Sequence, residues 1–353
     1  MARIDFHVQR YAFHSLAAAA LFGASTPFAK LLLGEISPVV LAGVLYLGSG
    51  LGLAALRLVQ SRRGHSHEAH LVARDWTALA GAILAGGVAA PVLLLWGLSK
   101  TGAAETALLL NFESVITVLV AGLLFREAVG GRVWLAAAVM LAGGFVLAYE
   151  PTSSLGFTPY SLAIVGACLG WAVDNNLTRK VAGADPVAIS MTKGIAAGSF
   201  NLVLGLALGG ALPAIGTAAG ALALGFVAYG VSLVLFIYAL RHLGAARTAA
   251  HFSTAPFIGA VLAVPLLGEP VTVGLIAAAT LMVIATWLVL TERHAHEHGH
   301  EHMSHNHRHT HDEHHQHAHR GDEGPEPHSH EHVHEPMRHA HPHLPDLHHR
   351  HRH

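Results

Sequence analysis

The sequence predicts an all-α integral membrane protein with ten transmembrane helices, arranged as two inverted five-helix repeats and followed by a disordered histidine-rich tail. Three observations support this fold class: long apolar segments with few charges, a five-span unit that occurs twice, and a C-terminal segment rich in histidine. We divide the chain into a cytoplasmic N-terminus (1–10), a first five-span repeat (11–150), a second repeat (151–292) and the tail (293–353).

Each predicted span is a continuous apolar stretch of about 20 residues, the length that a helix needs to cross the hydrocarbon core. Barrel strands are not expected, because their residues would alternate between apolar and polar. Helices also satisfy every backbone polar group within their own segment, as lipid requires. The ten spans cover roughly residues 11–33, 38–59, 76–98, 104–125, 132–149, 159–178, 187–208, 218–240, 246–267 and 271–290.

The Lys and Arg residues near the span ends orient the predicted bundle. Thirteen of them lie on one side, and two, Lys30 and Lys100, lie on the other. Because cytoplasmic loops collect Lys and Arg, we expect both termini and the loop at 60–75 to face the cytoplasm. We expect a bacterial inner membrane protein, with the lipid bilayer as its main partner.

This orientation gives a first testable prediction. A reporter fused after Glu292 should register as cytoplasmic, and a cysteine introduced at Ser153 should react with an impermeant reagent added outside the cell. Labelling of Ser153→Cys only after permeabilisation would contradict the ten-span topology.

The repeat becomes visible when the chain is shifted against itself. LLLWGLSKTGAAETA (93–107) then aligns with LFIYALRHLGAARTA (235–249), an offset of 142 residues (235 minus 93). An odd number of spans in each repeat places the second copy upside down in the membrane, which is typical of secondary transporters with a substrate site near mid-membrane. The same offset pairs Glu127 with Glu269, and we expect both to stabilise short corners between spans.

With these features, residues 11–292 resemble the EamA type of the drug/metabolite transporter superfamily. The resemblance rests on Gly-Ala-Ala at 102–104 and 244–246, the corners Arg126-Glu127 and Gly268-Glu269-Pro270, and Asp185-Pro186 before the seventh span. It implies ten spans in two five-span domains, a carrier that usually exports small metabolites, and no bound organic cofactor. The histidine tail is not part of the family's common pattern.

Ionisable side chains inside spans cost free energy and are functional candidates by default. Glu113 is the strongest, because the fourth span places it near the bilayer centre. Asn111, two positions earlier, is a further candidate for contact with substrate or a coupling ion. The counterpart of Glu113 in the second repeat is Ala255, which argues against a structural role shared by both halves. We expect Glu113 to bind substrate or to carry a coupling proton; the alternative is a carboxylate held by neighbouring donors for packing.

Three further ionisable groups lie at similar depth: Asp174, Lys193 and His251. Asp174 and Lys193 could neutralise each other or bind the two ends of a zwitterion, and a structural ion pair is the favoured interpretation. His251 is a weaker candidate for coupling, since a single histidine in a helix is more often a hydrogen-bonded structural residue. Asn175 offers an amide for contact between helices or with substrate.

The histidine segments predict binding of a divalent transition metal such as zinc, nickel or cobalt. Imidazoles at every second position of an extended chain can turn onto one ion, although nothing in the pattern selects one metal. A solvated tail with weak incidental affinity is the alternative. The candidate ligands are His65, His67, His70, His294, His296, His298, His300, His302, His305, His307, His309 and His311.

Three functions compete: a transporter of a small solute, which is an organic metabolite or a metal ion; a membrane-anchored metal buffer or sensor; and an intramembrane enzyme. Ten spans with an internal repeat exceed what an anchor needs, and the sequence contains no HExxH, GxSxG or P-loop motif. We therefore expect a transporter with no enzyme activity and no nucleic-acid partner, and the resemblance implies that it works in the direction of export. A homodimer is compatible with the sequence.

Overall fold

The computed structural model describes residues 6–61, 71–125, 131–149, 158–181 and 184–290, and four short stretches of the tail, 295–299, 303–309, 328–334 and 338–342. Within these residues, the first repeat forms α1 (Phe6–Leu32), α2 (Pro38–Ser61), α3 (Asp75–Ala82), the π-helix η1 (Ile83–Ala89), α4 (Ala90–Lys100), α5 (Ala103–Leu109), α6 (Phe112–Phe125) and α7 (Gly131–Ala148). The second forms α8 (Pro159–Arg179), α9 (Pro186–Ala207), α10 (Ile215–Gly225), the π-helix η2 (Phe226–Val231), α11 (Ser232–Phe252), α12 (Ala255–Leu267) and α13 (Val273–Leu290).

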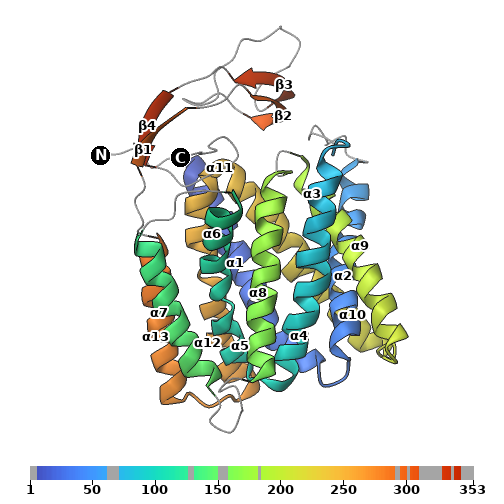
Figure 1. The fold of residues 1–353 in the computed structure, drawn as a ribbon. Helices are drawn as coiled ribbons and strands as arrows, with labels where there is room; N and C mark the ends of the chain where they lie inside the picture. Colours follow the sequence, from blue (N-terminus) through green and yellow to red (C-terminus); the bar gives the residue numbers. More distant parts are fainter. Residues whose placement is uncertain are drawn as a thin grey trace.

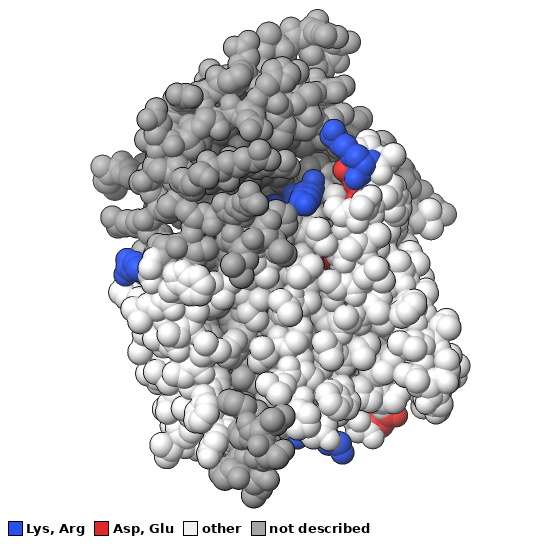
Figure 2. Space-filling view, in the orientation of Figure 1, with Lys and Arg blue, Asp and Glu red and all other residues white. Residues whose placement is uncertain are grey.

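The helices form an all-helical membrane bundle in which the two halves are interleaved (Figure 1). Helix α2 of the first half packs on α9 of the second, α1 packs on α11 and α12, and α7 packs on α13. Five described helices are long and apolar enough to cross a membrane, and shorter apolar helices accompany them. On the face seen in Figure 2, charged side chains gather toward the two ends of the molecule and leave an uncharged belt between them, which matches an integral membrane protein.

Glycine lets α2 and α9 approach each other closely. A Cβ atom built on Gly50 would lie 2.5 Å from the backbone nitrogen of Ile195, and one built on Gly194 would lie 2.5 Å from the nitrogen of Gly50. A side chain at either position would therefore push the two halves apart. Small residues thus allow close packing of two helices along this interface.

The fourth predicted span is not one continuous helix, as the sequence suggested, but two half-helices. Helix α5 ends at Leu109 and α6 begins at Phe112, because the Asn111 side chain donates a hydrogen bond to the Leu108 carbonyl at 2.8 Å and so competes with the helical pattern. The second repeat breaks at the equivalent point between α11 and α12, where the Thr254 hydroxyl donates to the His251 carbonyl at 2.7 Å. The break is thus a feature of both halves.

The predicted boundary between the eighth and ninth spans, at 241–245, is also wrong. The first repeat has a break at Thr101, whose hydroxyl donates to the Gly97 carbonyl at 2.9 Å and whose backbone is extended. The corresponding residue in the second repeat is Leu243, which has no hydroxyl group. Helix α11 accordingly continues to Phe252, and α12 is a short helix of 13 residues.

The tail was expected to be disordered, whereas its described stretches form two antiparallel strand pairs. Strand β1 (Ala295–Gly299) pairs with β4 (Arg338–Pro342), and β2 (Met303–His309) pairs with β3 (His328–His334). The histidines of these stretches recur at every second position, and such a period of two residues is typical of a strand. The low apolar content of the tail had instead favoured disorder. His296 and His298 lie on β1, and His305, His307 and His309 lie on β2. The other expected ligands, His65, His67, His70, His294, His300, His302 and His311, lie outside the described residues.

Candidate functional site

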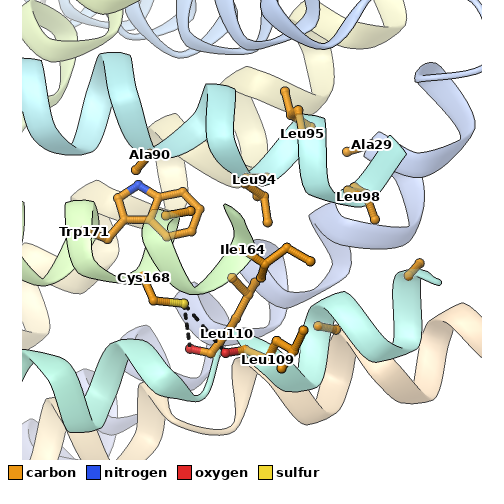
Figure 3. Packing of buried hydrophobic residues seen from close by; sticks show 14 of the residues in the cluster. Ala29, Ala90, Leu94, Leu95, Leu98, Leu109, Leu110, Ile164, Cys168 and Trp171 are labelled. Carbon is orange, nitrogen blue, oxygen red and sulfur yellow. Dashed lines mark hydrogen bonds between the residues drawn. The ribbon is translucent and has the colours of Figure 1, made fainter. Parts of the chain in front are cut away.

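Glu113 occupies the first turn of α6, directly after the break in the fourth span. The partial positive charge at the start of a helix stabilises a carboxylate at this position. The break itself is held by α8, because the Cys168 thiol donates to the Leu109 carbonyl at 3.6 Å (Figure 3). The side-chain amide of Asn111 donates to the Leu108 carbonyl at 2.8 Å and lies 4.0 Å from the Met282 sulfur, so Asn111 lies at the break itself.

Asn175 of α8 is the hydrogen-bond partner of Glu113. Its side-chain amide donates to Glu113 Oε1 at 2.8 Å, so two residues expected to be functional meet in the structure. Glu113 and Asn175 are both half-buried residues that keep some accessible surface. One turn along α6, the Thr117 hydroxyl is buried without a hydrogen-bond partner. The carboxylate of Glu113, the amide of Asn175 and the hydroxyl of Thr117 are therefore candidates for further hydrogen bonds to a solute.

Asp174 and Lys193 form a buried ion pair beside this group. Lys193 Nζ donates to both carboxylate oxygens of Asp174, at 2.6 and 2.8 Å, and the two side chains are 6% and 8% exposed. Thr178 completes the cluster, because its hydroxyl donates to Asp174 at 2.7 Å. The pair is therefore neutral as a unit, with its hydrogen bonds made internally.

The ion pair needs the glycine at position 86 of η1. A Cβ atom there would lie 2.4 Å from the Cγ and Cβ atoms of Asp174, so only glycine leaves room for the carboxylate. The π-helix also frees backbone carbonyls: the Ala90 N–H bonds Ala85 instead of Gly86, and Pro91 has no N–H to bond Gly87. Such freed groups must find other partners in a membrane protein.

Three side chains donate hydrogen bonds to these carbonyls. The Tyr46 hydroxyl donates to the Gly86 carbonyl at 2.8 Å, and the Trp171 indole donates to the same oxygen at 3.0 Å. The amide of Asn201 donates to the Gly87 carbonyl at 2.9 Å. Helices α2, α8 and α9 are thereby fixed to η1 at the level of the ion pair. The Gly86-Gly87 pair before Pro91 is the sequence signal of this arrangement.

Aromatic rings from several elements gather next to Trp171. The Phe22 ring of α1 lies 5.9 Å from Trp171, 5.8 Å from Tyr229 and 5.5 Å from Phe252, measured between ring centroids. The rings of Tyr46 and Tyr229 are 5.5 Å apart. Trp171 stands one helical turn before Asn175, so these two side chains lie on the same face of α8. We call these five rings the aromatic cluster; the sequence analysis did not identify it.

His251 lies in the last turn of α11, at the corresponding break in the second repeat. Its carbonyl accepts the Thr254 hydroxyl there. Among the described residues, no group of three or more His, Cys, Asp or Glu side chains is placed to hold a metal ion. Glu113, Asp174 and His251 therefore do not form a metal-binding cluster.

Glu269 links the second repeat to the first at the start of α5. Gly268 ends α12 with φ 65°, a left-handed conformation that glycine adopts without strain. The Glu269 carboxylate then accepts the N–H groups of Ala103 and Ala104 at 2.6 and 2.9 Å, at the start of α5. Its expected structural role is confirmed. Glu127, its counterpart, lies outside the described residues.

Glu269→Ala should destabilise the bundle, because it removes the group that caps α5. Loss of such a cap typically costs about 0.5–2 kcal/mol. The thermal midpoint of the detergent-solubilised protein should fall, whereas Glu35→Ala, which removes an exposed carboxylate bonded to Thr217, should change it little. Equal shifts for the two variants would contradict the capping role.

Comparisons with known proteins agree with this architecture. The EamA-like transporter family matches residues 10–149 and again residues 158–291. An uncharacterized transporter of Methanothermobacter thermautotrophicus is 27% identical over 274 residues, which is 73% of this chain and 79% of that protein. The uncharacterized protein PA1977 of Pseudomonas aeruginosa is 34% identical over 169 residues, 47% of this chain and 58% of that protein.

A solved crystal structure shares the fold. It superposes with a TM-score of 0.58 at 17% sequence identity and covers 79% of this chain and 96% of its own. At this identity the likeness concerns the fold alone. The two family matches, together with the membrane bundle and its repeated helix break, show that the chain is a transporter of the EamA-like family and not an enzyme.

Proposed function

We propose that this transporter carries a small organic solute, in the direction of export, and that Glu113 and Asn175 form the centre at which the solute or a coupling proton binds. The observation that carries the proposal is the 2.8 Å contact between these two half-buried side chains at the start of a half-helix. Secondary transporters bind their substrates at such interrupted helices near mid-membrane. A carboxylate that can exchange a proton at this point can couple flux to a proton gradient.

A divalent metal ion is the second candidate for the cargo, and the histidine segments favour it. Against it stands the composition of the bundle, since a metal path needs several ligands at one depth. The described residues offer no group of three such ligands. The ammonium group of Lys193 would also repel a metal cation that approached the Asp174 carboxylate. We therefore place the organic solute first.

The test is a flux assay in proteoliposomes, with zinc, nickel and cobalt compared with amino acids and organic amines, each with and without a proton gradient. Gradient-dependent flux of an organic solute supports the proposal. Flux of metal ions alone would establish the second candidate instead. A membrane-anchored metal buffer would move none of these compounds.

We further propose that the tail is cytoplasmic and binds zinc, nickel or cobalt. A chain that stops after Arg293 should insert and transport as the full chain does, because the spans end before the tail begins. It should lose most of its metal binding, and the binding by the full chain should weaken as the pH falls through about 6.5, the ordinary pKa of histidine.

Equilibrium dialysis of metal and flux of solute, measured on full-length and truncated protein in the same vesicles, check the role of the tail. Complete loss of flux on truncation, at normal protein levels, would show that the histidines belong to the transport mechanism. Unchanged metal binding by the truncated chain would refute binding by the tail.

A further inference from the structure

The charges of the interior restrict the class of solute that the Glu113 site can accept; this inference rests on the function proposed above. Of the described side chains that lie well inside the spans, the charged ones near the helix break are Glu113, Asp174 and Lys193. Lys193 holds both oxygens of Asp174 at 2.6 and 2.8 Å, so these two charges cancel. Glu113 has a neutral amide as its partner, and the site therefore carries one uncompensated negative charge when Glu113 is ionised.

The aromatic cluster begins one helical turn from Asn175, the hydrogen-bond partner of Glu113. Trp171 precedes Asn175 by one turn of α8, and Phe22 lies against it with ring centroids 5.9 Å apart. Phe22 in turn contacts Tyr229 and Phe252, which extends the aromatic cluster to two further elements, η2 and α11. The face of an aromatic ring attracts a cation, and the attraction is larger where water is excluded.

The two repeats are unequal at this point. The residue that corresponds to Glu113 in the second repeat is Ala255, and the backbone of Ala255 packs directly against Gly23, the neighbour of Phe22. Of these two corresponding positions, the one in the first repeat therefore carries a carboxylate, whereas the one in the second repeat packs on α1. A symmetric pair of acidic groups, suited to a doubly charged ion, is not formed by these residues.

We propose that the solute is an organic monocation, a primary or quaternary amine with an apolar body. Glu113 pairs with its charge, and the aromatic cluster receives the apolar part. An anion would be repelled by Glu113. A zwitterion would leave its carboxylate without a partner, because Lys193 is already held by Asp174. A divalent metal would lack ligands.

The experiment measures direct binding to the full-length protein in detergent by titration calorimetry. The probe is benzyltrimethylammonium, compared with benzyl alcohol, benzoate and phenylalanine, which present the same ring with no charge, a negative charge and a zwitterionic charge. We expect benzyltrimethylammonium to bind at least ~10-fold more tightly than the other three, since only its charge is attracted both by the Glu113 carboxylate and by the faces of the aromatic rings. Equal affinity for benzyl alcohol, or tighter binding of benzoate or phenylalanine, would overturn the proposal.

Two variants test the parts of the site. Phe22→Leu should weaken the binding of benzyltrimethylammonium ~10-fold, whereas Phe13→Leu, on the same helix but 69% exposed, should leave it unchanged. Glu113→Gln should weaken it by a similar factor or more. If Phe22→Leu folds normally and binds benzyltrimethylammonium with unchanged affinity, the proposed role of the rings is overturned.

The same titrations separate this inference from the function on which it rests. If benzyltrimethylammonium does not bind while another solute shows flux that requires Glu113, the proposed transport centre stands and the cationic solute is refuted. If the cation binds equally well to Glu113→Gln, both the centre and the solute class are refuted.

Discussion

Glu113→Gln is expected to reduce gradient-driven flux to the level of empty vesicles while the protein still inserts and folds. Glutamine keeps the shape of glutamate and can still bond the Asn175 amide through its oxygen, which lies 2.8 Å away in the wild-type structure. It cannot ionise, so it can neither exchange a proton nor pair with a positive charge. The measurement is uptake of the identified solute into proteoliposomes with an imposed proton gradient.

The control for this variant is Glu105→Gln, which changes a carboxylate on the neighbouring half-helix α5. Glu105 accepts a hydrogen bond from the Ser161 hydroxyl at 3.2 Å, near the end of the bundle and away from the break. We expect it to retain flux. Full gradient-driven flux in Glu113→Gln would reduce Glu113 to a packing residue and would remove the proposed centre.

Asp174→Leu is expected to cause the largest loss of stability. Leucine has the branched shape of aspartate, but it leaves the Lys193 ammonium buried without a counter-charge, and removal of one partner from a buried ion pair typically costs about 3–5 kcal/mol. The double variant Asp174→Leu with Lys193→Met should recover most of that loss, because a buried pair can often be replaced by apolar side chains of similar volume.

The free energy of unfolding of these variants can be compared in mixed micelles of increasing SDS content. Asn175→Ala is the matched control, since it alters the next residue of α8 and removes only the bond to Glu113. A double variant as unstable as Asp174→Leu would show that the pair contributes more than mutual neutralisation. A single variant as stable as the wild type would show that Lys193 finds another partner.

Several features of the site could be predicted from single residues. Glu113 stood out because a carboxylate inside an apolar stretch is costly, and the ion pair of Asp174 and Lys193 was the favoured interpretation of two opposite charges at one depth. The contact between Glu113 and Asn175 joins residues 62 positions apart, and no local pattern indicated it. Asn111, expected at the site, instead terminates α5.

The helix breaks show where sequence patterns reach their limit. The residues on both sides of Leu110 are mostly apolar, so the sequence predicts one continuous helix through this position. Whether Asn111 bonds the backbone or the solvent depends on the environment that α8 and α13 provide, including the Cys168 thiol and the Met282 sulfur. The same holds for the carbonyls of Gly86 and Gly87, whose partners come from three other helices.

The sequence by itself determined the membrane class, the approximate positions of the spans, the two related halves and the family, because these follow from apolar length and from a repeat that can be aligned. The tertiary structure decided which helices are interrupted, which charges cancel and which rings surround Glu113. The physical reason is that hydrophobic periodicity acts along one segment, whereas a buried polar group is satisfied by donors and acceptors from other segments. Gly86 is an example. It leaves space for the Asp174 carboxylate, and its carbonyl accepts hydrogen bonds from Tyr46 and Trp171, only when α2, η1 and α8 are packed together.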